Sequence, residues 1–261
     1  MTFAYALTLT AQLISFSLVL FSIEMLNLSK SDMVRSVWSS KNLIGDLQTG
    51  LPLPRFLVSW LSSENTLRQL SIAELIVAVA SLLFPSGANF IFLFVVHLLI
   101  CIRFRGTFNG GSDQMIFVVL GGTAVAFLFK DERVAKFGLI YIAVQMSYAY
   151  FRAGLAKITK KTWLKGQALP SFLLSSPYPG IRSMSIWLIA HPKIAAASSL
   201  LVIAFELLVW TSSFSGFLAT FFFSGAVAFH FVIYRAFGLN RFFWAWLSAW
   251  PSLLYLANYR P

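Results

Sequence analysis

Three residues near the middle of the chain could do chemistry from one face of a helix. Tyr150, Gly154 and Lys157 lie at i, i+4 and i+7 in an apolar segment, so a helix of 3.6 residues per turn presents them on the same side. That side carries a phenol, a gap beside a small residue, and an amine. The gap admits a neighbouring helix or a flat ligand close to the backbone. Because lysines that end apolar helices usually extend to the lipid headgroups, spacing alone also allows a purely structural role.

A second candidate is the turn sequence Asn109-Gly110-Gly111-Ser112-Asp113. Asn-Gly-Gly is typical of turns, and Ser112 or Asp113 is a suitable N-cap for the apolar segment that follows. This structural interpretation accounts for the residue types. In the functional alternative, the glycine amides bind an anion or oxyanion while Asp113 orients a neighbouring group.

Glutamates within apolar segments form a third group, because ionisable side chains are costly there and often functional. They are Glu24, Glu74 and Glu206. Glu206 lies deepest in its segment, and we expect it to contact Lys157 or an arginine. The alternative is an interhelical hydrogen bond with no chemical role, since buried polar groups need partners in any case.

The sequence has no recognisable metal or nucleotide motif. Its three histidines lie in separate segments and form no HxxxH or ExxH pattern, so we predict no metal site. His97 is expected to make an interhelical hydrogen bond, and His191 to lie at the interface. The single cysteine, Cys101, excludes an internal disulfide and CxxC redox chemistry. Walker, GxSxG and GxGxxG sequences are absent.

The composition is that of a membrane protein. Of 261 residues, 58% are hydrophobic and 11% are charged, whereas soluble domains have about a quarter charged residues. The net charge of +11 is assigned to interfacial Lys and Arg that face anionic lipid, and nucleic acid is not an expected partner. The length fits one domain over residues 1–261, without a sizeable soluble part.

We therefore expect an all-α bundle of about eight transmembrane helices, the first being a span and not a removed signal peptide. The predicted spans are residues 4–26, 68–85, 88–104, 114–130, 135–157, 194–212, 215–236 and 241–258. The two longest connections, 27–67 and 158–193, contain amphipathic interfacial helices that could cover a cavity, the first broken at Pro52 and Pro54. With eight spans, 16 of the 20 Lys and Arg residues lie on the side of these connections, which predicts that this side is cytoplasmic.

The segment around Lys157 resembles a known family. Tyr-Phe-Arg-Ala-Gly-Leu-Ala-Lys at 150–157, then Trp-Leu-Lys-Gly-Gln-Ala-Leu at 163–169, is similar to the sequence around the active-site lysine of the vitamin K-dependent γ-carboxylase superfamily. Its members share the horizontally transferred transmembrane (HTTM) domain. In that family the lysine is the proposed base that deprotonates a reduced quinone, and it aligns with Lys157. In length the chain is closer to short bacterial members of the sporulation-delaying-protein B type, which are implicated in maturing a secreted toxin peptide.

The resemblance implies a protein of the bacterial cell membrane that binds a quinol-like (vitamin K-like) or lipid ligand and helps to mature a secreted peptide, with a partner subunit. Lys157 would be the base, and Asp113 and Glu206 would assist it. The implied ligand-binding residues are Asn109, Gly110, Gly111, Tyr150, Gly154, Trp163 and His230. The carboxylase histidine that follows Asn109 in the family is missing at 110–112, so the resemblance supports the fold and the lysine more than it supports glutamate carboxylation.

Two other classes of function stay open at this point. One is a non-catalytic membrane partner in the maturation, export or immunity of a peptide toxin. The other is a small proton-coupled transporter in which Glu74 and Glu206 relay protons.

Overall fold

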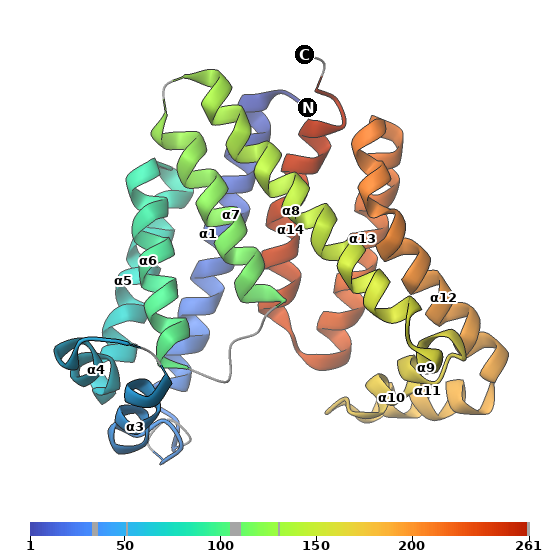
Figure 1. Cartoon of the computed structure of the whole chain (residues 1–261), viewed down its shortest axis with the longest axis horizontal. Coiled ribbons are helices and arrows are strands. Elements are labelled where there is room, and N and C mark those ends of the chain that lie inside the picture. Colours follow the sequence, from blue (N-terminus) through green and yellow to red (C-terminus); the bar gives the residue numbers. More distant parts are fainter. Residues whose placement is uncertain (33–35, 51, 105–110, 130, 260–261) are drawn as a thin grey trace. The chain divides into compact units, whose positions relative to one another are not determined.

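The structure is a computed structural model that describes residues 1–32, 36–50, 52–104, 111–129 and 131–259. Within these ranges all regular secondary structure is helical (Figure 1). The prediction of an all-α protein is therefore confirmed.

The chain divides into two compact units, each described here by itself. The N-terminal unit is residues 7–138, and the C-terminal unit is residues 1–6 with 139–261. Helices α1 (Phe3–Leu28) and α8 (Glu132–Ile158) have residues in both units. The single domain over 1–261 stays a prediction.

In the N-terminal unit, long apolar helices pack as sequential neighbours. Besides α1, its helices are α3 (Ser40–Gly50), α4 (Arg55–Ser62), α5 (Glu64–Leu83), α6 (Gly87–Arg103) and α7 (Ser112–Leu128). Helix α6 packs on both α5 and α7. The Ser86 side chain caps α6 by accepting a hydrogen bond from the Asn89 amide at 3.2 Å, which fixes a sharp turn between α5 and α6. Phe21, Leu47, Leu61 and Ile100 form part of the buried core.

The C-terminal unit combines long helices with a series of short ones. After α8 come α9 (Lys161–Leu164), α10 (Ala168–Leu174), α11 (Pro179–Ala190), α12 (Pro192–Leu208), a 3-10 helix η1 (Val209–Phe214), α13 (Gly216–Phe237) and α14 (Asn240–Leu256). Gly238, with φ of 70°, ends α13 in the left-handed conformation that glycine adopts without strain. The chain then turns at once into α14, which packs on α13.

The helices fit the predicted spans closely. Each of the eight predicted segments is helical over most of its described residues, although the sixth changes from α12 to the 3-10 helix η1 at Val209. The number of eight spans stays a prediction. Among the described residues, five helical segments are long and apolar enough to cross a membrane: Phe3–Leu28, Glu64–Leu83, Glu132–Ile158, Pro192–Phe214 and Gly216–Phe237. Helices α6 and α7 are apolar but shorter. The outward faces carry large apolar side chains, such as Phe217 and Leu201, which suits contact with lipid. These features indicate a multi-pass membrane protein.

The two long connections contain short helices, as predicted. The first holds α3 and α4, and Pro54 lies at the N-terminus of α4, where the sequence predicts a break. Leu47 on α3 and Leu61 on α4 are buried, while Phe56 on α4 is 75% exposed, so each of these helices has a buried side and α4 also has an exposed apolar residue. The second connection holds α9, α10 and α11. The location of both connections at a membrane interface stays a prediction.

Candidate functional site

Lys157 and Glu206 form an ion pair in the C-terminal unit. Lys157 lies in the last turn of α8, and Glu206 lies near the end of α12. The ammonium Nζ donates to both carboxylate oxygens at 2.7 Å. The Glu206 side chain is 5% exposed and that of Lys157 is 20% exposed. The carboxylate is therefore buried and the amine is partly accessible. The predicted contact between these residues is confirmed.

Two neighbours shape the surroundings of this ion pair. The half-buried Trp163 ring lies 5.2 Å from Lys157 Nζ, a distance at which an aromatic face attracts a cation. One turn earlier on α8, a Cβ on Gly154 would lie 2.9 Å from Leu207 Cγ and 3.0 Å from Leu207 N. The glycine thus lets α12 approach closely, which brings Glu206 within reach of Lys157. The space beside Gly154 was expected to admit either a neighbouring helix or a flat ligand. In the structure, helix α12 fills it.

Tyr150 and His230 form a second polar contact that starts from α8. The Tyr150 hydroxyl lies 2.6 Å from His230 Nε2 on α13, and both residues are buried. The Trp246 ring stacks on His230 at 5.2 Å and meets the Tyr150 ring edge-on at 4.7 Å. Two predicted ligand-binding residues therefore contact each other inside an aromatic cluster.

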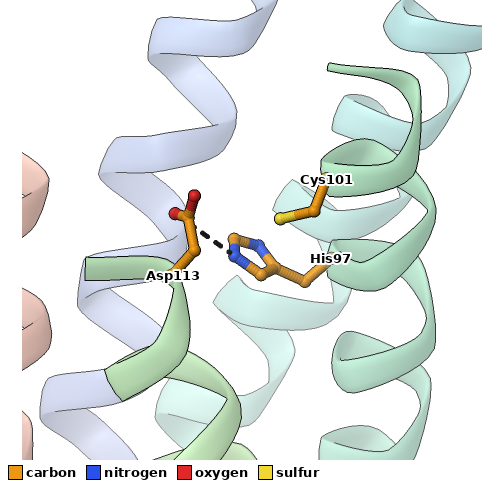
Figure 2. A group of neighbouring side chains, drawn as sticks. All are labelled: His97, Cys101 and Asp113. Atoms are coloured by element: carbon orange, nitrogen blue, oxygen red, sulfur yellow. Dashed lines mark ion pairs between the residues drawn. The ribbon is translucent and has the colours of Figure 1, made fainter. Parts of the chain in front are cut away.

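The predicted turn site belongs to the N-terminal unit. Asn109 and Gly110 lie outside the described residues. The prediction that Ser112 or Asp113 caps α7 is wrong, because the N-cap is Gly111 and Asp113 lies within the first turn. The Asp113 side chain points instead toward His97 on α6 (Figure 2), with Oδ1 3.8 Å from Nε2.

His97 is the centre of a polar network in this unit. Its Nδ1 lies 3.0 Å from Glu74 Oε1 on α5, and the other Glu74 oxygen accepts a hydrogen bond from Ser22 Oγ on α1 at 2.9 Å. His97 and Glu74 are fully buried. The prediction of an interhelical hydrogen bond by His97 is confirmed.

Cys101 lies beside this network, although its sequence context indicates only the absence of an internal disulfide and of CxxC redox chemistry. It follows His97 by four residues, so both side chains leave the same face of α6 (Figure 2). Ligand atoms of His97, Cys101 and Asp113 all lie within 4.8 Å of one another. The His-x-x-x-Cys spacing of His97 and Cys101 was the sequence signal for this cluster. It identifies only two of the three residues, because Asp113 lies on another helix.

Two other polar residues, Arg103 and His191, have opposite environments. Arg103, counted among the interfacial basic residues, is fully buried at the end of α6 and donates from Nη1 to the Leu61 carbonyl. His191 is exposed, with Nδ1 2.8 Å from the Trp187 carbonyl oxygen, as suits its expected location at an interface.

Comparisons with known proteins give no family. No family model, curated protein or solved structure matches the chain significantly. The HTTM resemblance of residues 150–169 therefore stays a prediction, and the functional argument depends on the geometry.

Proposed function

We propose that this chain is an HTTM-type protein of the bacterial cell membrane that uses the Lys157–Glu206 pair to move a proton on a membrane-dissolved ligand. Eight spans would comprise the five long segments together with α6, α7 and α14. The ligand would be a quinol-like molecule or a lipid, and the biological outcome would be the maturation of a secreted peptide. The observation that carries this proposal is the ion pair, with its buried carboxylate and partly accessible amine.

Ionisable groups inside an apolar helix bundle are rare and commonly mark a functional site. Transfer of one proton from Nζ to Oε, across 2.7 Å, converts the ion pair to an amine and a carboxylic acid without changing the net charge. The neutral amine is the form that acts as a base. Lys157 would then accept a proton from a hydroxyl group of the ligand, while Glu206 holds the proton it received.

The aromatic residue beside the amine suits a flat aromatic headgroup. Trp163 presents its ring beside Nζ, and aromatic rings stack favourably on one another. A quinol would supply acidic hydroxyl groups for the base. Asp113 belongs to the N-terminal unit, where it faces His97, and the proposal does not require it.

The test uses purified protein in lipid nanodiscs and a membrane-soluble naphthol as the probe. Deprotonation of the bound naphthol is followed by the absorbance of its anion. We expect the anion with the wild-type protein and none with Lys157→Arg, because a guanidinium keeps the ion pair with Glu206 but does not give up its proton. Lys136→Arg on the same helix is the matched control. An equal yield of anion in Lys157→Arg and wild type would refute the role of Lys157 as base.

A non-catalytic role in peptide maturation is the second candidate. The observation that favours it is that both Glu206 oxygens bond the same amine, as expected of a bridge that only holds α8 to α12. Cells that carry Lys157→Arg at normal protein levels decide between the two. Continued peptide processing supports the non-catalytic role, and lost processing supports catalysis.

A further inference from the structure

We propose that His97, Cys101 and Asp113 form a binding site for a zinc-class divalent metal ion in the N-terminal unit. The site is independent of the proposed function, since it shares no residue with the Lys157–Glu206 pair. It lies among α1, α5, α6 and α7, and its three side chains point toward one another (Figure 2).

The backbone places the three ligands together. His97 and Cys101 are one turn apart on α6, and Asp113 lies in the first turn of α7, which packs on α6. Around a tetrahedral zinc ion, ligand atoms are about 3.3–3.7 Å apart by the usual bond lengths. Here Nε2 and Oδ1 are 3.8 Å apart, and no pair exceeds 4.8 Å. A decrease of roughly 1 Å in the distances between the ligand atoms gives tetrahedral zinc geometry, and small side-chain rotations can supply it.

The imidazole is already oriented as a metal ligand. Its Nδ1 faces Glu74 Oε1 at 3.0 Å, and Ser22 Oγ holds the other oxygen of this carboxylate at 2.9 Å. With the Nδ1 proton donated to Glu74, the Nε2 lone pair faces Asp113 Oδ1 at 3.8 Å, and the Cys101 side chain lies beside the same ring. Among the described residues, the fully buried Nε2 makes no hydrogen bond. A carboxylate behind a histidine is the arrangement that commonly orients metal-bound imidazoles.

The donor set selects the class of metal. One thiolate, one imidazole and one carboxylate suit Zn²⁺ and its neighbours in the first transition row, whereas Ca²⁺ and Mg²⁺ prefer oxygen ligands alone. The thiolate and the Asp113 carboxylate together balance the charge of a divalent ion, and the thiol proton is released on binding. Three protein ligands leave the fourth position open for water or a substrate.

The rings of Phe21 and Phe117 lie 4.7 and 5.2 Å from the imidazole, so the site has an apolar wall. Such a wall limits solvent access and strengthens the attraction between the ion and its ligands. The competing interpretation is a hydrogen-bond network in which His97 joins two carboxylates and no metal binds.

Titration of the purified, chelator-treated full-length protein with Co²⁺ distinguishes these interpretations. Since Cys101 is the single cysteine of the chain, a sulfur-to-cobalt charge-transfer band in the near ultraviolet can arise only from this residue. We expect the band to saturate at one equivalent and Zn²⁺ to abolish it. Cys101→Ser should lose the band, and Glu74→Gln should keep it while weakening metal affinity about 10–100-fold. His191→Ala, which changes an exposed histidine, should titrate like the wild type.

Absence of the band in folded wild-type protein overturns the proposal and leaves the hydrogen-bond network only. Equal Co²⁺ affinity in Cys101→Ser and wild type also overturns it. The thermal midpoint of each metal-free variant shows whether the variant is folded. Because the spectrum of the wild-type protein is itself decisive, a variant that fails to fold does not prevent a conclusion.

Discussion

In the N-terminal unit, polar side chains from α5, α6 and α7 converge on the imidazole of His97, whereas in the C-terminal unit helix α8 makes separate polar contacts with α12 and α13. Glu74 and Asp113 approach opposite nitrogens of His97. Among the described side chains, Lys157 pairs with Glu206 and Tyr150 with His230, each as a one-to-one contact. Both arrangements lie in apolar surroundings, yet their connectivity differs.

The difference has physical consequences. A group in a one-to-one contact loses its only partner when that partner is removed, so the full cost of burying it appears. A convergent cluster presents several donor atoms to one point in space, which is what a bound ion requires. One-to-one contacts are therefore sensitive to the loss of either partner, and the convergent cluster is suited to binding an ion.

Removal of one member of the Lys157–Glu206 pair gives the largest expected effect. Glu206→Ala leaves the ammonium at the edge of an apolar interior without its carboxylate, and unpaired buried charges cost about 3–5 kcal/mol. Because the Lys157 side chain is 20% exposed, we expect about 3 kcal/mol. Equilibrium unfolding in mixed micelles measures this change.

The control for this prediction removes both charges. Lys157→Met with Glu206→Leu should recover most of the lost stability, since no unpaired charge remains. A Glu206→Ala protein as stable as the wild type would show that the pair is not a one-to-one contact and would break the comparison between the units.

Gly166 tests whether the backbone of the second connection fixes Trp163 near Lys157. Its φ is 72°, and a Cβ there would lie 2.3 Å from the Ala196 backbone nitrogen on α12. Gly166→Ala should destabilise the protein by at least about 2 kcal/mol, because left-handed backbone conformation and overlap with rigid backbone both oppose a side chain. Thermal unfolding in detergent measures the loss.

Gly180→Ala is the matched control, since nothing lies within 4 Å of a Cβ at this helical position. It should not lower stability, because alanine favours a helix over glycine. If both substitutions had the same effect on stability, the backbone conformation at Gly166 would not be required to hold the second connection in place.

The helices were predictable because their signal is local. Runs of apolar residues give the positions of α1, α5, α8 and α13 directly, and Pro54 breaks the first connection where expected. The cap of α7 was predicted incorrectly, because Asp113 is a good N-cap by residue type but is directed to a partner on another helix. Local propensity does not include such tertiary contacts.

The candidate sites were predictable only in part. Lys157 and Glu206 could be paired from the rarity of charge in apolar segments, since few partners exist there. The convergence on His97 could not, because Glu74, Cys101 and Asp113 are spread over 40 positions and three helices. Which faces of the helices meet depends on packing, and periodicity gives no information on that.

The Tyr150–His230 contact is expected to contribute less than the ion pair. Tyr150→Phe removes the partner of His230 Nε2, and an unsatisfied buried polar group costs about 1–3 kcal/mol. Among the described residues His230 Nδ1 has no hydrogen-bond partner, so this imidazole depends on Tyr150. Equilibrium unfolding should show a loss of about 1–2 kcal/mol.

A double-mutant cycle with His230→Phe isolates the contact. The double variant should lose less stability than the sum of the single variants, because no buried nitrogen is then left without a partner. Strictly additive effects would show that the two residues do not depend on each other.

The smallest effect is expected for an ion pair elsewhere on α8. Lys136 Nζ lies 2.7 Å from Glu132 Oε1, but the two side chains are 28% and 67% exposed. The contact distance equals that of the Lys157–Glu206 pair, so the main differences between them are burial and the second carboxylate oxygen that Lys157 bonds. Exposed pairs at i and i+4 contribute about 0.3–0.5 kcal/mol, and Lys136→Ala should lose no more than that in equilibrium unfolding. High salt should remove this small difference while leaving the Glu206→Ala effect largely intact, because water and ions screen only the exposed pair. A loss at Lys136 comparable to that at Glu206 would mean that contact geometry, and not burial, determines the strength of both pairs.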